Sequence, residues 1–148
     1  MSIATKKAAG GHTLALVLVC ALGFAATPLA RGQSYTERVL HLFTDKADGG
    51  FPQAGLVRDA AGNLYGTTYE GGAVGYGTVF EVSAGGTESV LYTFTGGADG
   101  GRPFAGLVRD AAGNLYGTAQ SGGDLNCNAP YGCGTVFELS ASGAERVL

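Results

Sequence analysis

The 148-residue chain has no tryptophan, only two histidines and three cysteines, and few charged residues. From residue 33 onward His41 is the single histidine, and no serine lies in a nucleophile-elbow sequence, which excludes the common hydrolytic triads. The same scarcity leaves no clustered ligands for a metal-hydrolase or redox-metal site. We therefore expect a protein that is not an enzyme and that needs no cofactor.

Proline is also scarce, with 4 residues, whereas glycine supplies 27. This imbalance is typical of glycine turns between strands rather than of a disordered or collagen-like chain. No window beyond the first thirty residues has the periodicity of a helix of useful length. The composition therefore predicts an all-β protein with one domain at most.

Residues 1–32 have the features of a secretory signal peptide. Lys6 and Lys7 form its basic segment, residues 14–26 form its apolar segment, and small residues follow. The alternative is an uncleaved anchor helix, but the apolar run is shorter than the roughly 20 residues that a bilayer span needs. We therefore predict a secreted mature chain, residues 33–148, with no segment inserted in the membrane. Cleavage after Ala30 and lipidation of Cys20 are the alternatives.

The predicted mature chain is acidic, with twelve acidic residues, six basic ones and a formal net charge of −6. An acidic surface argues against nucleic acids and anionic membranes as partners, because phosphate binding requires clustered lysine and arginine. It is compatible with a carbohydrate or a surface protein as partner.

Two cysteines lie in the mature chain, Cys127 and Cys133, and export would place them where disulfides persist. We predict a disulfide between them, which closes a short loop and has a modest effect on global stability. Half of a zinc site is the alternative, but such a site needs about four ligands and His41 is distant in the sequence.

The mature chain contains two copies of one unit, 51 positions apart. Residues 54–67, AGLVRDAAGNLYGT, recur letter for letter at 105–118. The second copy gains six residues after Gly123, and the copies then resume in phase, which marks the insertion as a surface loop. We place the two repeats at about residues 40–91 and 91–148.

Each repeat contains four short β-prone runs separated by turn signals. In the last run of the first repeat, Val90, Tyr92 and Phe94 are predicted to share one face of a half-buried strand. Four antiparallel strands in a repeat of about 50 residues predict a β-propeller-like blade, with a β-solenoid or a small sandwich as alternatives. The first repeat is expected to form strands at residues 55–58, 64–68, 78–82 and 88–94.

Two blades form an incomplete ring, because a propeller typically needs 4–8 blades to close. Residues 36–40 match residues 87–91 and 144–148, so we expect the mature chain to begin with a complete fourth strand that runs to Phe43. Either the chain is the front of a longer array, or several copies form a homo-oligomer that completes one propeller.

Aspartate and arginine adjoin in the identical turns of the two repeats. Asp59 and Asp110 are expected to cap these turns. Arg58 and Arg109, which precede them, are expected to form a repeated structural ion pair with these aspartates.

Loop aromatic residues are the candidate ligand-binding residues. Tyr69 and Tyr76 lie in the first glycine-rich segment, and Asn126 and Tyr131 lie in the cysteine loop. An exposed tyrosine can stack on a sugar while a nearby polar side chain bonds its hydroxyls. Ordinary loop tyrosines are the alternative.

The repeat resembles the GloVer tandem repeat of bacterial secreted and surface proteins, whose recurring pattern is similar to GLVRDAAGNLYGTT, then a glycine-rich segment, then GTVFELS. Residues 134–140, GTVFELS, are a close example. The resemblance covers almost the whole mature chain. It implies an exported, often surface-anchored protein with many repeats and no established biochemical activity. We expect a non-catalytic repeat protein with a structural, adhesion or protein-interaction role at the cell surface. The alternative is a lectin-like, carbohydrate-binding propeller module.

Overall fold

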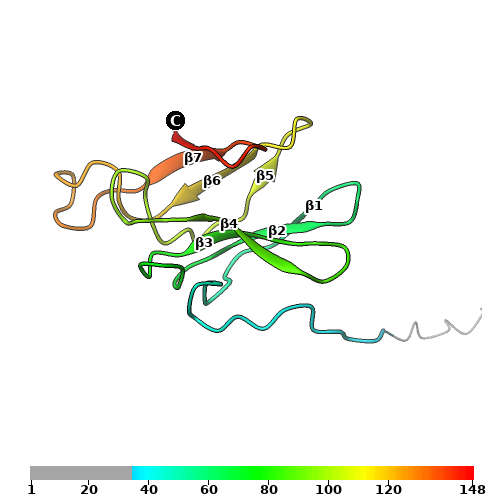
Figure 1. The fold of residues 1–148 in the computed structure, drawn as a ribbon. Coiled ribbons are helices and arrows are strands. Elements are labelled where there is room, and N and C mark those ends of the chain that lie inside the picture. Colours follow the sequence, from blue (N-terminus) through cyan, green and yellow to red (C-terminus); the bar gives the residue numbers. More distant parts are fainter. Residues whose placement is uncertain (1–34) are drawn as a thin grey trace, which may run out of the picture. The chain divides into compact units, whose positions relative to one another are not determined.

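The computed structural model describes residues 35–148, which form two four-stranded antiparallel β-sheets (Figure 1). The first sheet contains, in order, β1 (Val57–Arg58), β2 (Leu64–Thr68), β3 (Thr78–Val82) and β4 (Glu88–Thr93). The second contains β5 (Val108–Arg109), β6 (Leu115–Ala119), β7 (Thr135–Leu139) and β8 (Glu145–Val147). The predicted all-β class and the four strands of each repeat are confirmed.

The predicted signal peptide, residues 1–32, lies outside the described residues. Within residues 35–148 there is no helix of sufficient length and hydropathy to cross a membrane.

Identical turns join β1 to β2 and β5 to β6. The Asp59 carboxylate accepts hydrogen bonds from the backbone and side-chain nitrogens of Asn63, at 2.9 and 3.0 Å, and from the Tyr65 hydroxyl at 3.1 Å. Desolvation alone would raise the pKa of Asp59, but these hydrogen bonds outweigh it and lower that pKa. Asp110 makes the same contacts in the second turn, so the predicted capping role is confirmed.

The prediction that Arg58 and Arg109 form ion pairs with the neighbouring aspartates is wrong. In the part of the chain that the structure describes, the ion pairs join His41 to Asp48 and Arg146 to Glu138. The Arg109 guanidinium lies instead over the ring of Tyr65, 5.4 Å from its centroid, because the neighbouring aspartate is already occupied by its turn.

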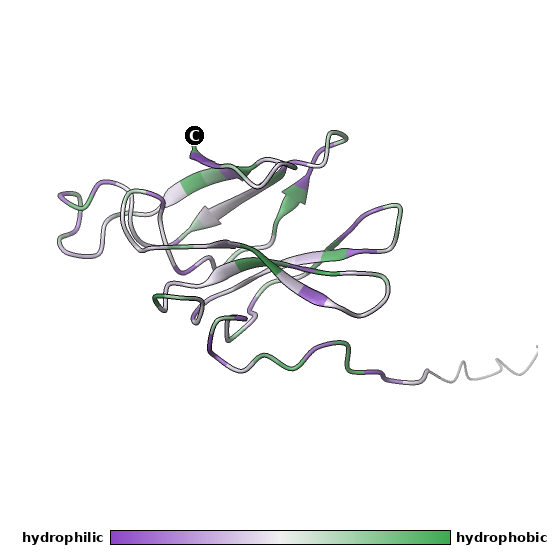
Figure 2. Ribbon diagram, in the orientation of Figure 1, coloured by the Kyte–Doolittle hydropathy of each residue, from purple (hydrophilic) through white to green (hydrophobic). Residues whose placement is uncertain are grey.

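The two sheets pack against each other through a shared apolar core. Phe94, which follows β4, meets Phe137 of β7 edge to face, with ring centroids 5.0 Å apart. We call the face of each sheet that packs in this core its inner face, and the opposite face its outer face. The core comprises Val79 of the first sheet, Phe94 of the segment that follows it, and Leu107, Leu115, Phe137 and Leu139 of the second repeat. Hydrophobic residues recur along the strands of both sheets (Figure 2).

Glycine at the centre of β6 makes room for the inner face of the second sheet. A Cβ atom at Gly117 would lie 2.6 Å from the Phe137 ring and 2.9 Å from the Leu107 side chain. Gly66 of β2 has the same relation to Phe80 and Leu56, on the outer face of the first sheet. Any larger residue at these positions would push the aromatic ring out of place.

A β-bulge alters the predicted pattern of β4. The pairing of β3 with β4 shifts register between Val79 and Phe80, so that Tyr92 pairs with Val79 and Val90 pairs with Phe80. Adjacent residues of β3 point to opposite faces, so Tyr92 lies on the inner face and Val90 on the outer face. The prediction that these two residues share a face is therefore wrong.

Residues 36–43, predicted to form a strand, lie outside any strand. A fourth strand pairs with the third strand of its own sheet, and β3 and β7 already pair with β4 and β8. We call residues 37–43 the N-terminal arm. Its end is fixed by Phe43, which packs edge to face on Phe80 of the outer face of the first sheet, at 4.9 Å.

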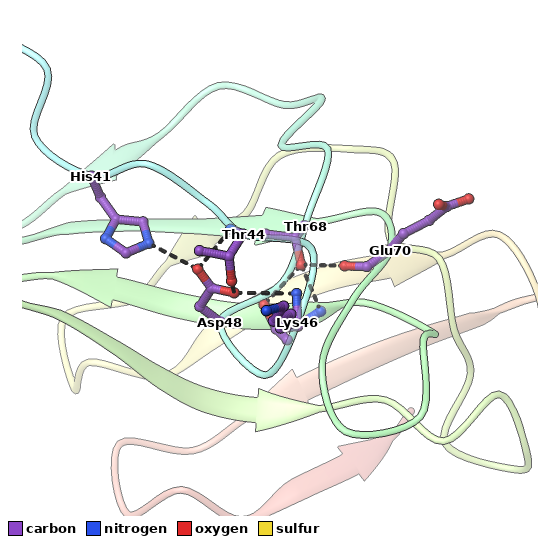
Figure 3. A network of polar contacts seen from close by, with 7 residues as sticks. His41, Thr44, Lys46, Asp48, Thr68 and Glu70 are labelled. Carbon is purple, nitrogen blue, oxygen red and sulfur yellow. Dashed lines mark hydrogen bonds and ion pairs between the residues drawn. The ribbon is translucent and has the colours of Figure 1, made fainter.

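A network of polar contacts holds the chain after the arm (Figure 3). The backbone N–H and the hydroxyl of Thr44 donate hydrogen bonds to the Asp48 carboxylate, at 2.8 and 2.6 Å. His41 Nε2 lies 3.4 Å from the same carboxylate. The Thr44 hydroxyl is the largest cause that lowers the pKa of Asp48 to about 2. Asp48 therefore stays ionised and fixes the turn that follows the arm.

Candidate functional site

Arg102 lies where the segment after β4 meets the glycine-rich loops. Its backbone N–H donates to the Tyr76 carbonyl at 2.8 Å, and its own carbonyl accepts from the Gln120 N–H at 3.3 Å. Arg102 adopts a left-handed backbone conformation, with φ at 55°, which is uncommon for a residue other than glycine. The guanidinium carbon lies 5.8 Å from the ring centroids of both Tyr69 and Tyr76. These contacts hold a cation beside two aromatic rings.

A small cavity opens beside Arg102. Its volume is about 50 Å³. In the described chain, Arg102 Nε and Ser121 Oγ are buried and have no hydrogen-bond partner. Buried polar atoms are normally paired, so both are available to a bound polar group or to water. Small-molecule sites are typically about 300–1,000 Å³, so this cavity admits a small functional group rather than a whole sugar ring. It is lined by Tyr76, Gly96, Arg102, Ser121, Pro130 and Tyr131.

The inserted loop of the second repeat brings Tyr131 to this cavity. We call residues 124–133 the disulfide loop, because the structure forms the predicted bond between Cys127 and Cys133. The Gly122 N–H donates to the Tyr131 carbonyl at 2.7 Å. A Cβ atom at Gly132 would lie 2.0 Å from the Gly122 carbonyl oxygen, so this close approach requires glycine.

The structure gathers three of the four predicted ligand-binding residues around Arg102. Tyr76 and Tyr131 line the cavity with it, and Tyr69 flanks its guanidinium. Asn126 is not part of the cavity lining, because its backbone and side-chain amides both donate to Asp124 within the disulfide loop.

Sequence reasoning missed Arg102 and Ser121. The signal that could have found them is a difference between the repeats, since the equivalent positions in the first repeat hold Phe51 and Glu70. Arg102 and Ser121 thus replace an aromatic residue and an acidic residue in the second repeat only. A difference of this kind between otherwise similar repeats indicates a site with its own role.

A larger cleft, of about 340 Å³, lies between the two sheets near the turn that follows β7. The Arg109 guanidinium covers the Tyr65 ring here, and Arg109 Nε is buried without a hydrogen-bond partner in the described chain. Burial, followed by the hydrogen bond to Asp59, raises the pKa of Tyr65, so its hydroxyl stays protonated. The volume falls in the roughly 300–1,000 Å³ range of small-molecule sites. Its other lining residues include Glu81, Leu91, Leu115 and Leu139.

In residues 35–148, no group of three or more His, Cys, Asp or Glu side chains could hold a metal ion. The side chains that line the two hollows include guanidinium groups, tyrosine rings and hydroxyl groups.

The chain matches a known protein family. A family model described as the Gloeobacter/Verrucomicrobia repeat matches residues 24–148, which is most of the chain. No curated protein and no solved structure matches it. The family match confirms the resemblance that the repeated motif indicates.

Proposed function

Because the chain belongs to the Gloeobacter/Verrucomicrobia repeat family, we propose that it is a secreted, non-catalytic repeat protein that contacts other proteins at the cell surface. The basic and apolar segments of residues 1–32 support export. The two sheets are consecutive blades of a propeller-like array, a proposal supported by the four-stranded meander of each repeat and by face-to-face packing.

The outer faces of the sheets carry this proposal. On the outer face of the second sheet, Val108, Val136 and Leu148 are large apolar residues that are exposed to solvent. On the outer face of the first sheet, Leu56 is exposed as well. Grouped apolar side chains on a surface mark sites of protein contact, because their burial is favourable.

Photo-cross-linking tests the role in protein contact. A photoreactive amino acid at Val136 is expected to give protein adducts when the full chain is produced in an exporting bacterial host. The matched control is Val74, which is similarly exposed but lies in the loop between β2 and β3. Absence of any protein adduct at Val136 and Leu56, or equal adducts at Val74, would contradict the proposal.

Fractionation of the same cells tests secretion. The chain is expected outside the cytoplasm, with residue 33 as its first residue by mass spectrometry. A chain that keeps residues 1–32 and stays in the cytoplasm would contradict export.

Binding of an acidic carbohydrate is the second candidate function, and the cavity beside Arg102 favours it. A carboxylate can pair with the guanidinium while the sugar ring stacks on the exposed Tyr131. A glycan array is expected to show binding that Tyr131→Ala removes and Val74→Ala preserves. Silence across acidic and neutral sugars would rule the carbohydrate function out.

A further inference from the structure

Two pairs of apolar residues at equivalent positions are buried in one sheet and exposed in the other, although Phe80 and Val82 are buried as their equivalents are. Leu107 is 6% exposed on the inner face of the second sheet, whereas Leu56, its equivalent on the outer face of the first sheet, is 51% exposed. Val79 is 0% exposed on the inner face of the first sheet, and its equivalent Val136, on the outer face of the second, is 51% exposed. Each outer face therefore matches one half of the contact that the two sheets already make.

A hydrogen bond between the two sheets also has an equivalent donor and an equivalent acceptor on the two outer faces. The hydroxyl of Thr67, a buried residue, donates to the Ala105 carbonyl at 3.4 Å. The equivalent Thr118 is exposed on the outer face of the second sheet, and the equivalent acceptor is the carbonyl of Ala54. The two outer faces thus carry complementary halves of a hydrogen bond.

The same holds for the stacked arginine. Arg109 of the second sheet covers the Tyr65 ring of the first. Its equivalent Arg58 is exposed on the outer face of the first sheet, and Tyr116, the equivalent of the ring, lies on the outer face of the second.

We propose that a second copy of this chain docks head to tail, with the outer face of its second sheet on the outer face of the first sheet. Val136 then takes the place of Val79, Leu56 that of Leu107, and Arg58 covers Tyr116 of the other copy. The inference rests on the proposed role in protein contact and names the chain itself as the partner. The complementarity of the two faces, and their equivalence to a contact that exists inside the chain, favour this occupant over an unrelated protein.

The N-terminal arm already supplies part of the docked contact. Phe43 packs on Phe80 as Phe94 packs on Phe137, and His41 lies beside Phe43 in the position of Tyr92.

One adjustment is needed for docking. Residues 37–40 of the arm correspond to residues 145–148 of the other copy, so the two segments would occupy the same position on the outer face of the first sheet. Residues 37–40 are exposed and lie outside any strand, and therefore they can move aside.

A contact between two different faces is heterologous and generates rings or filaments rather than an isologous dimer. Light scattering of the exported chain at several concentrations is expected to show assemblies of two or more chains. A monomer at every concentration would overturn the proposal.

Two variants separate head-to-tail docking from other association. Leu56→Asp damages one outer face and Val136→Asp damages the other, and both residues are exposed in the single chain, so both variants are expected to fold, as circular dichroism will check. Each variant alone is expected to be monomeric, whereas an equimolar mixture forms a one-to-one dimer through the two intact faces. Val74→Asp is the control and retains full assembly.

A monomeric mixture, or a single variant that still dimerises, would overturn head-to-tail docking. If the mixture stays monomeric while Val136 still gives protein adducts in cells, self-docking fails and the role in protein contact stands. If no adducts form with any protein, both fail.

Discussion

The N-terminal arm contacts the first sheet in the way that the end of β4 contacts the second. In each contact a phenylalanine ring meets another edge to face, Phe43 with Phe80 and Phe94 with Phe137. The arm brings one extended segment to its contact, whereas the first sheet brings four strands. Phe80 and Val82 are buried, as their equivalents Phe137 and Leu139 are, but Leu56 is 51% exposed whereas its equivalent Leu107 is 6% exposed. The arm therefore covers only part of the face that a complete sheet covers.

The turns that follow the two contacts differ little. Asp99 accepts hydrogen bonds from the backbone and hydroxyl of Thr95, as Asp48 does from Thr44. The Tyr92 hydroxyl also donates to Asp99 at 3.0 Å, and burial raises the pKa of Tyr92. Local sequence sets these turns, while the neighbouring sheet sets how much apolar surface is covered.

Removing the two equivalent rings is expected to give the largest effect. Phe94→Ala lowers the free energy of unfolding by about 3–5 kcal/mol, because Phe94 is fully buried between the sheets. Phe43→Ala lowers it by about 1 kcal/mol, because this ring is only partly buried. Urea unfolding at one protein concentration measures both. Equal losses would show that the arm contact is as strong as the contact between sheets.

The two equivalent leucines sharpen the comparison. Leu107→Ala is expected to lower the free energy of unfolding by about 2–5 kcal/mol, since it leaves a cavity in the core. Leu56→Ala is expected to change it by less than about 0.5 kcal/mol in the monomer, because this side chain is exposed. Each variant is the other's control in thermal unfolding, and a similar loss for both would contradict the difference in burial.

The disulfide loop is present in the second repeat only. Replacing Cys127 and Cys133 together by serine is expected to lower the free energy of unfolding by about 2 kcal/mol, the low end for disulfides, because the closed loop is short. Chemical denaturation with and without a reductant provides the measurement. A larger loss would mean that the loop supports the core of the second sheet.

The smallest effect is a pH dependence at the first turn. The pKa of Asp48 is lowered to about 2, so its contribution to stability is present above about pH 4 and is lost as the pH falls toward 2. Thr44→Ala removes the main hydrogen bond and is expected to raise this pKa toward its usual value. An NMR titration of the carboxylate gives the midpoint, and an ordinary midpoint in the unmodified chain would contradict the hydrogen-bond network.

The strands could be predicted because the turn residues that begin and end them lie next to them in the sequence. The turn beginning at Asp59 stops β1 and starts β2, and the recurrence of the motif 51 positions later fixes β5 and β6. The disulfide was equally local, since Cys127 and Cys133 are six residues apart.

Features that depend on a neighbour could not be predicted. Residues 36–43 match a fourth strand in sequence, but a strand needs a partner and none is in place. Val90 and Tyr92 alternate in sequence, yet a bulge against β3 separates them. Arg102 acquires its role only where three loops converge, which no periodicity reveals.

The disulfide loop is closed twice at its base, by the bond between cysteines and by the contacts of Gly122 with Tyr131 and Gly134. Residues 125–129 of the loop are exposed and line neither hollow, whereas Tyr131 and Gly132 contact Gly122. Substitutions at positions 125, 126, 128 and 129 are therefore expected to leave the fold unchanged, as long as Tyr131 and Gly132 are kept. Such positions let evolution, or a protein engineer, diversify recognition while the scaffold stays constant.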